Sequence, residues 1–239
     1  MQKNWKIIII LIIILAVASF LRLYRLTQHD AITDEVFYGY RSIGLIDSLN
    51  SPYQPTPYES FDKVPFWAKL SFHDHPPLGF WIQHLFFKIF GPNLLAMRLP
   101  FALAGIASVF LVYLIALLLF SKESVALLAS AVLAVNNYHV WVSRIGLQES
   151  LVIFFMLLAT WLFLKMVTPS SSPPIPRSGT GGERVGVYYY LTFAAVGLAI
   201  LLKYTAIVLL PVFLAYLLWH RRDLINWKRA VLGSVLLLA

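Results

Sequence analysis

The sequence contains no cysteine and few charged residues. Of its 239 residues 13% are charged, and only 11 are Asp or Glu. The absence of cysteine excludes a disulfide framework, a thiolate nucleophile and a cysteine-ligated metal within this chain. With 59% hydrophobic residues and a mean hydropathy of +0.75, the composition is too apolar for a soluble domain.

The apolar residues form long blocks, which are typical of membrane spans. The first block runs from Trp5 to about Leu26. Its Ala-Val-Ala at 16–18 resembles a cleavage site, so a removed signal peptide is the alternative to a retained span. The apolar character resumes after this site, which favours a retained span. The sequence predicts further spans at Leu94–Phe120, Ser124–Val142, Leu151–Val167, Tyr188–Leu202 and Thr205–Trp219.

The distribution of basic residues predicts the orientation of these spans. A net charge of +8 would also fit nucleic-acid binding, but the basic residues flank the apolar blocks, so no nucleic-acid partner is predicted. If the chain turns at Lys203, ten of the 19 basic residues but only three of the 11 acids share the side of the N-terminus. The positive-inside rule places that side in the cytoplasm. We therefore expect an all-α, multi-pass integral membrane protein.

The segments between the spans differ in character. Residues 27–93 are predicted to form a first extracytoplasmic loop, in which Leu78–Phe90 suits an amphipathic helix lying at the membrane surface. Residues 168–187 contain a Pro-, Gly- and Ser-rich stretch and are predicted to form a cytoplasmic linker. The last apolar run is too short to cross a bilayer, so residues 1–239 are expected to be one transmembrane domain that is incomplete at its C-terminus.

Ionisable residues recur at the predicted outer face. Asp34 and Glu35 adjoin at the start of a helical pattern. Two acids in a first helical turn, behind a Thr33 cap, also stabilise a helix without any catalysis. Ionisable groups at membrane depth are costly, however, and indicate a functional site. The motifs at this face also include His73, His75, Arg98, Arg144, Glu149 and Lys203.

The order of these motifs resembles a known family of membrane enzymes. It comprises DE in the first outer loop, HPPLG before an amphipathic helix, RLPFALAG opening a long span, then SR…ES and GLAILLK. From about Trp5 to Arg222 this is similar to the dolichyl-phosphate-mannose–protein mannosyltransferases, whose bacterial relatives include the undecaprenyl-phosphate-aminoarabinose lipid A transferases. Two positions depart from the family pattern: Phe80 replaces a basic residue of eukaryotic members, and Glu149 replaces an Asp common in relatives.

The resemblance implies a fold, an activity and two site residues. The fold would be the GT-C-type helical membrane domain, in a prokaryotic plasma (inner) membrane with the active site facing outward. The enzyme would move a sugar, with inversion, from a polyprenyl-phosphate donor to the hydroxyl of an acceptor protein, lipid or glycan. Asp34 would be the catalytic base, and Arg98 would lie near the lipid phosphate.

Elementary chemistry extends this set of candidate residues. A base must take the proton of the acceptor hydroxyl, and Asp34 with Glu35 can supply it, with Glu149 as a further carboxylate. Cations must stabilise the phosphate leaving group, and Arg98, Lys203 and Arg144 are the candidates.

His73 and His75 are candidate ligands of a divalent metal, since imidazole suits zinc or manganese. The alternative is that they order the Pro-Pro turn or contact substrate. His75 and Tyr38 are candidate substrate-binding residues, although an aromatic belt at the membrane interface explains Tyr38 equally well. No other cofactor is predicted.

Two other kinds of protein are weighed against an enzyme. A polytopic transporter would line a path with charged residues, but transporters commonly show paired repeats with charges near the midplane. Here no repeat is visible and the charges gather at one face. A non-catalytic scaffold leaves these carboxylates unexplained.

Overall fold

The computed structural model describes residues 5–44, 75–168 and 180–225, and within these ranges it is helical without a strand. The helices are α1 (Trp5–Leu23), α2 (Thr33–Gly44), α3 (Leu78–Phe90), α4 (Leu94–Phe120), α5 (Glu123–Val135), α6 (Asn137–Ser143), α7 (Glu149–Val167), α8 (Thr180–Ile200) and α9 (Leu209–His220), with 3-10 helices η2 (Tyr204–Val208) and η3 (Arg222–Leu224). The all-α prediction is confirmed.

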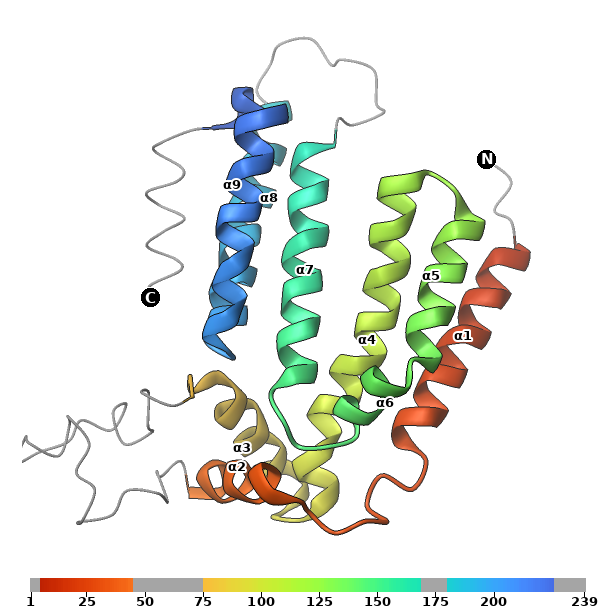
Figure 1. The fold of residues 1–239 in the computed structure, drawn as a ribbon, viewed down its shortest axis with the longest axis vertical. Coiled ribbons are helices and arrows are strands. Elements are labelled where there is room, and N and C mark those ends of the chain that lie inside the picture. The colour runs from red at the N-terminus through yellow and green to blue at the C-terminus, as the bar shows by residue number, and fades with distance from the viewer. Residues whose placement is uncertain (1–4, 45–74, 169–179, 226–239) are drawn as a thin grey trace, which may run out of the picture.

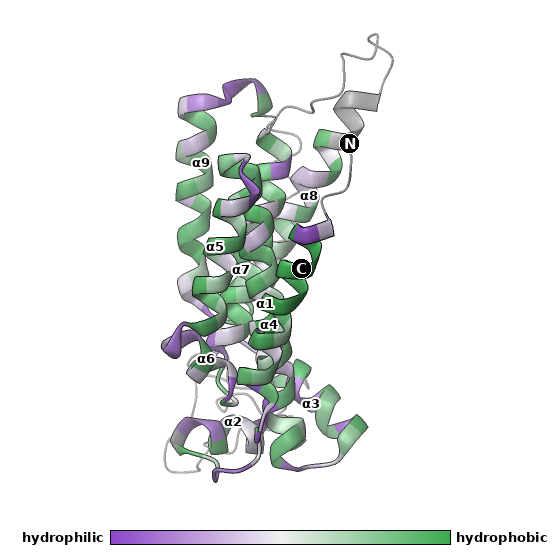
Figure 2. Ribbon diagram, turned by 90° about the vertical axis from the view of Figure 1, so that its right-hand side faces the viewer, coloured by the Kyte–Doolittle hydropathy of each residue, from purple (hydrophilic) through white to green (hydrophobic). Residues whose placement is uncertain are grey.

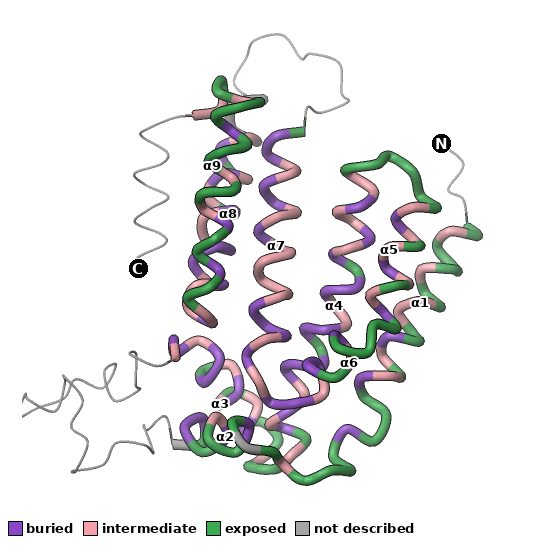
Figure 3. The backbone as a smooth tube through the Cα atoms, in the orientation of Figure 1, coloured by how far each residue is buried: buried purple, intermediate pink, exposed green. Residues whose placement is uncertain are grey.

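The long helices form a bundle, and α2 and α3 lie across one of its ends (Figure 1). Helix α4 packs against α1, α5 and α7, and α7 packs against α8. Buried residues concentrate on α4, α7 and α8, while α1 and α9 expose much of their surface (Figure 3). Hydrophobic residues dominate the middle of the bundle and polar residues gather at its ends (Figure 2). This pattern suits a bundle surrounded by lipid.

Three helices, α1, α4 and α7, are long and apolar enough to cross a membrane. Helices α5 and α6 together would make a fourth span, bent by 61° at their junction, while the apolar segments Val185–Ile200 of α8 and Tyr204–His220 of η2 and α9 are shorter. The predicted span Ser124–Val142 is therefore two helices that meet at Asn136 and not a single helix. The Asn136 side chain accepts a hydrogen bond from the backbone N–H of His139, which caps α6 and begins a new helix.

A buried arginine of α1 satisfies the polar groups that this break exposes. Arg22 has no exposed surface, and its guanidinium donates to the carbonyls of Ala134 at 3.0 Å and Leu133 at 3.3 Å. It also lies 2.7 Å from Nδ1 of His139. Because the last carbonyls of a helix have no partner within the helix, Arg22 stabilises the bend and holds α1 against it.

The chain alternates between the two ends of the bundle as the charge pattern predicts. It turns at Lys203, between α8 and η2, and this turn lies at the same end as α2 and α3 (Figure 1). We call this the α2–α3 end. One boundary differs: α8 begins at Thr180, inside the predicted linker 168–187, of which residues 169–179 lie outside the described residues. Residues 45–74 of the predicted loop 27–93 lie outside the described residues.

The predicted orientation is testable with single cysteines, because the chain has none of its own. Gln28 is exposed at the α2–α3 end, and Lys122 is exposed at the α4–α5 junction of the opposite end. On intact cells, a membrane-impermeant maleimide should label Gln28→Cys and spare Lys122→Cys until the cells are opened. Labelling of Lys122→Cys alone would invert the orientation.

Candidate active site

Glu35 and Arg98 form a buried ion pair at the α2–α3 end. Nε of Arg98 donates to Oε1 of Glu35 at 2.7 Å, and Nη2 donates to Oε2 at 2.9 Å. Glu35 has no exposed surface and Arg98 is 4% exposed. Such a two-point contact between a planar guanidinium and a carboxylate fixes the orientation of both side chains.

The same carboxylate organises the start of α2. Oε1 of Glu35 accepts from the backbone N–H of Gly146 at 2.7 Å, and Oε2 accepts from that of Ile32 at 3.3 Å. A glutamate in the first turn of a helix commonly accepts from the backbone N–H of the N-cap residue, and here that residue is Ile32. The prediction that Thr33 caps this helix is therefore off by one residue. A Cβ on Gly146 would lie 3.0 Å from Cγ of Glu35, so glycine allows this close approach.

Arg98 uses all five of its N–H donors on protein groups. Beyond the two bonds to Glu35, Nη1 donates to the carbonyls of Leu26 at 2.8 Å and His29 at 2.9 Å, and Nη2 donates to that of Asp30 at 3.0 Å. The guanidinium thus ties α4 to the segment that leads into α2. In this geometry Arg98 has no donor left for the lipid phosphate that the sequence assigns to it.

Asp34 has the opposite environment to its neighbour Glu35. It lies in the first turn of α2, is exposed, and makes no hydrogen bond or ion pair with the part of the chain that the structure describes. The two adjacent acids therefore separate into a buried carboxylate that organises the backbone and an accessible one at the surface of the α2–α3 end.

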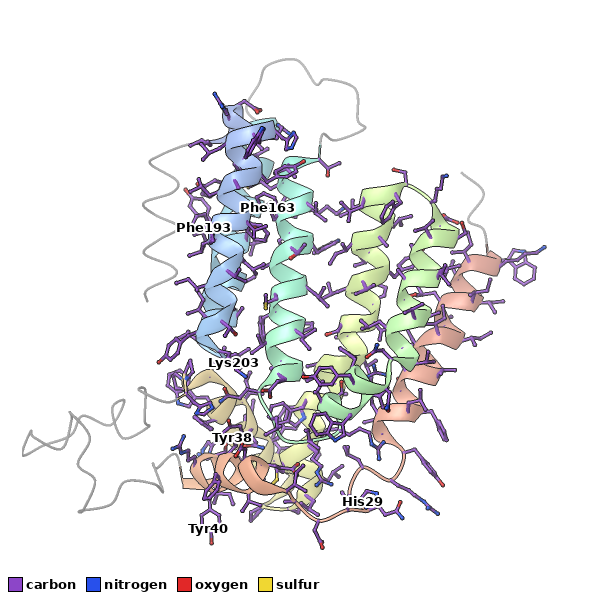
Figure 4. The ribbon with its side chains drawn as sticks, in the orientation of Figure 1. His29, Tyr38, Tyr40, Phe163, Phe193 and Lys203 are labelled. Atoms are coloured by element: carbon purple, nitrogen blue, oxygen red, sulfur yellow. The ribbon has the colours of Figure 1, made fainter. Side chains whose placement is uncertain are left out.

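Lys203 and Glu149 form a second, more accessible ion pair at this end. Nζ of Lys203 lies 2.8 Å from Oε1 of Glu149, with the side chains 39% and 32% exposed. Oε2 of Glu149 is buried and has no hydrogen-bond partner among the described residues. Figure 4 shows Lys203 at the end of the bundle, on the side that faces α2 and α3. The pair joins the start of α7 to the turn after α8.

Tyr38 and His75 join α2 to the start of α3. The hydroxyl of Tyr38 lies 2.6 Å from Nε2 of His75, and the Tyr38 ring packs edge-on against Phe80. Tyr38 faces the bundle, whereas Tyr40 points away from it and is 69% exposed (Figure 4). His73, the other candidate metal ligand, lies outside the described residues. Within the described ranges no three His, Asp or Glu side chains are grouped closely enough to hold a metal.

Arg144 lies between α6 and α7 and is half-buried. Its guanidinium donates to the carbonyls of Leu21 at 2.7 Å and Arg25 at 3.1 Å, at the end of α1. Burial, with the nearby charge of Arg98, lowers the pKa of Arg144 below its usual value. Two guanidinium groups with one buried carboxylate make this region attractive to an anion.

Sequence reasoning missed two buried glutamines at this end. Gln83 joins three helices: its amide donates to the Met97 carbonyl at 2.9 Å and accepts from the Ser42 hydroxyl at 2.5 Å. Gln148, directly before α7, is 3% exposed, and neither polar atom of its amide has a partner among the described residues. The only signal for Gln148 in the sequence is its place beside Glu149.

A bundle of apolar helices with two helices across a polar end is the architecture of GT-C membrane enzymes. The crystal structure of the Archaeoglobus fulgidus oligosaccharyltransferase, tethered with an acceptor peptide, is similar with a TM-score of 0.67 over 90% of this chain and 26% of that chain, at 16% identity. The structure of ArnT from Cupriavidus metallidurans bound to undecaprenyl phosphate has a TM-score of 0.65 over 100% of this chain and 40% of that chain, at 19% identity. At these identities the similarity defines the fold.

The family follows from the sequence itself. Residues 74–239 match the family model described as Dolichyl-phosphate-mannose-protein mannosyltransferase, and the chain belongs to this family. It is 33% identical over 166 residues to YkcB of Bacillus subtilis, a protein named as a mannosyltransferase. The match covers 70% of this chain and 22% of YkcB. The chain is 27% identical to undecaprenyl phosphate-alpha-4-amino-4-deoxy-L-arabinose arabinosyl transferase 1 of Pseudomonas fluorescens, covering 66% of this chain and 26% of that protein. The chain thus spans about a quarter of the length of these relatives.

Proposed function

We propose that the chain belongs to a membrane glycosyltransferase that moves a sugar from a polyprenyl-phosphate donor to an acceptor hydroxyl. The reaction would occur at the α2–α3 end, on the extracytoplasmic side. The observation that carries the proposal is the exposed carboxylate of Asp34, held beside a buried and fully hydrogen-bonded Glu35. Family membership, and an ArnT structure that holds undecaprenyl phosphate, support the choice of donor.

In this mechanism Asp34 is the general base. It takes the proton of the acceptor hydroxyl, and the resulting oxygen attacks the anomeric carbon of the donor sugar. The bond from that carbon to the phosphate oxygen breaks on the opposite face, so a single displacement inverts the configuration. The lipid phosphate leaves as an anion, and Asp34 then releases its proton to solvent. Because phosphate is already a good leaving group, no strong general acid is needed.

Lys203 and Arg144 are the proposed contacts of the donor phosphate. Nζ of Lys203 has three donors and is partly exposed, so it can keep its bond to Glu149 and still approach an anion. Arg144 donates to two backbone carbonyls, which leaves further N–H donors of its guanidinium for an anion, and it lies near the charge of Arg98. Cations placed where negative charge develops lower the barrier to transfer.

Glu35, Arg98 and Glu149 receive positioning roles. The Glu35–Arg98 pair fixes the start of α2 and thereby the direction of Asp34, while Glu149 orients Lys203. Tyr38 and His75 remain candidate substrate-binding residues, since Tyr38 faces the bundle (Figure 4) and its hydroxyl contacts His75.

The proposed function is tested with purified full-length protein and radiolabelled undecaprenyl-phosphate mannose. With a membrane extract as the source of acceptors, we expect label to move covalently from the lipid to an acceptor, and boiled protein to transfer none. A transporter would instead move the labelled lipid from one leaflet of sealed proteoliposomes to the other, with the sugar still attached. Such movement without transfer would overturn the proposal.

A further inference from the structure

The amide of Gln148 is a buried polar group that the mechanism so far does not use. It is 3% exposed, and both Nε2 and Oε1 lack a hydrogen-bond partner within the described ranges. Leaving a buried donor or acceptor unsatisfied is costly, and the large majority of buried side-chain polar atoms in proteins are paired. Two unsatisfied atoms on one amide therefore indicate a missing partner.

The surroundings of Gln148 place this amide between two helix starts. It is the N-cap residue of α7, with no side-chain cap bond, and it packs against Gly79 in the first turn of α3. A Cβ on Gly79 would lie 3.0 Å from Cγ and Nε2 of Gln148. Glycine in the HPPLG motif therefore leaves the space that the amide occupies.

Open space lies one helical turn from the amide. Leu151 and Ile82, each three residues after Gln148 and Gly79, continue the same faces of α7 and α3. Both line a shallow, open apolar groove of about 280 Å³ between α3, α4 and α7.

The unsatisfied atoms select the chemistry of the missing partner. Nε2 of Gln148 donates, whereas Oε1 of Gln148 and the buried Oε2 of Glu149 accept. A phosphate offers acceptors only, so it would leave both oxygens unpaired and would be repelled by the carboxylate. A hydroxyl both donates and accepts, so hydroxyl groups can pair with the donor and the acceptor of the Gln148 amide, and a further hydroxyl of the same molecule can donate to Glu149. Lys203, bonded to the other oxygen of Glu149, lies on the proposed phosphate side.

We infer that Gln148, together with Oε2 of Glu149, binds hydroxyl groups of the sugar carried by the donor. This inference rests on the proposed function, because it names a subsite for the sugar of that reaction. The sugar is joined directly to the phosphate, which fits a hydroxyl site beside Lys203. The acceptor also carries a hydroxyl, so the test separates the two sources.

The test compares Gln148→Leu with Gln83→Leu in the full-length protein. Gln83 is an equally buried amide, 1% exposed, but both of its polar atoms are hydrogen-bonded. Replacing an unsatisfied amide by an apolar group of similar shape is neutral or stabilising, whereas replacing a satisfied one is costly. We therefore expect Gln148→Leu to keep or raise the thermal midpoint and Gln83→Leu to lower it.

Binding of two lipids supplies the functional readout. Gln148→Leu should weaken binding of undecaprenyl-phosphate mannose by about tenfold, the loss expected for one to two hydrogen bonds. Binding of sugar-free undecaprenyl phosphate should stay within about twofold of wild type, because the amide does not meet the phosphate. Folded Gln83→Leu should retain the wild-type preference between the two lipids.

Three results would overturn the inference. Equal losses for both lipids, with a lower thermal midpoint, would make Gln148 a structural residue. Unchanged binding of both lipids with a raised KM for the acceptor would assign the hydroxyl to the acceptor. If the wild type binds both lipids equally, it has no sugar subsite and the inference fails. If that protein still transfers label, the proposed function stands, and if it transfers none, the proposed function fails as well.

Discussion

Arg98→Ala should destabilise the protein by about 3–5 kcal/mol, the usual cost of leaving one member of a buried ion pair alone. Glu35 would remain as a carboxylate without exposed surface, and only the backbone N–H groups of Gly146 and Ile32 would still face it. The carbonyls of Leu26, His29 and Asp30 would also lose their donors. Thermal unfolding of purified protein in detergent should show a large drop in the midpoint.

Arg221→Ala is the matched control. Arg221 and Asp223 make the same two-point contact, at 3.0 and 2.9 Å, but at the surface, where solvent screens the attraction. The loss of this exposed pair should lower the midpoint far less. If both substitutions lower it equally, the Glu35–Arg98 pair is not structural, and the contact of Arg98 with the donor phosphate regains its place as the leading interpretation.

The sequence predicts the helices well because a bilayer fixes the length of an apolar span. Leu94–Phe120 is predicted and observed as one helix, since a long apolar run in lipid has no other way to pair its backbone groups. The turn at Lys203 follows from length and charge in the same way. The break at Asn136 could not be predicted in this way. Asn136 caps a new helix here because Arg22, more than 100 residues earlier in the chain, donates hydrogen bonds to the carbonyls that the break leaves unpaired.

The roles within the candidate site depend on tertiary contacts that no local pattern encodes. Successive residues of a helix point about 100° apart, so Asp34 and Glu35 cannot share one environment. Which of them faces the bundle is set by Arg98, 63 residues later in the chain. The sequence identifies the acids and the arginine as candidates. It cannot predict that Arg98 is fully occupied, because its carbonyl partners are set by the path of the chain after α1.

Asp34→Asn should slow sugar transfer by about 10²–10⁴-fold, the usual contribution of a positioned general base. The substitution keeps the size of the side chain and removes its affinity for a proton. Because Asp34 is exposed and makes no bond within the described structure, the fold and the thermal midpoint should not change. Donor binding should also stay near wild type, since the base acts on the acceptor.

Asp30→Asn provides a matched control four residues earlier in the same segment. Asp30 is also exposed, and only its backbone carbonyl is bonded to Arg98. The substitution makes the same change in charge close to Asp34 without altering the proposed base. Transfer by Asp30→Asn should remain near wild type, so a loss confined to Asp34→Asn cannot come from a general change in the local field.

Single-turnover transfer from labelled undecaprenyl-phosphate mannose, normalised to folded full-length protein, tests the account most directly. It predicts that Asp34→Asn binds the donor as wild type does and transfers its sugar at least about a hundredfold more slowly, while Asp30→Asn transfers normally. If Asp34→Asn keeps most of the wild-type rate, the exposed carboxylate is not the base, and Glu149 becomes the first candidate to replace it.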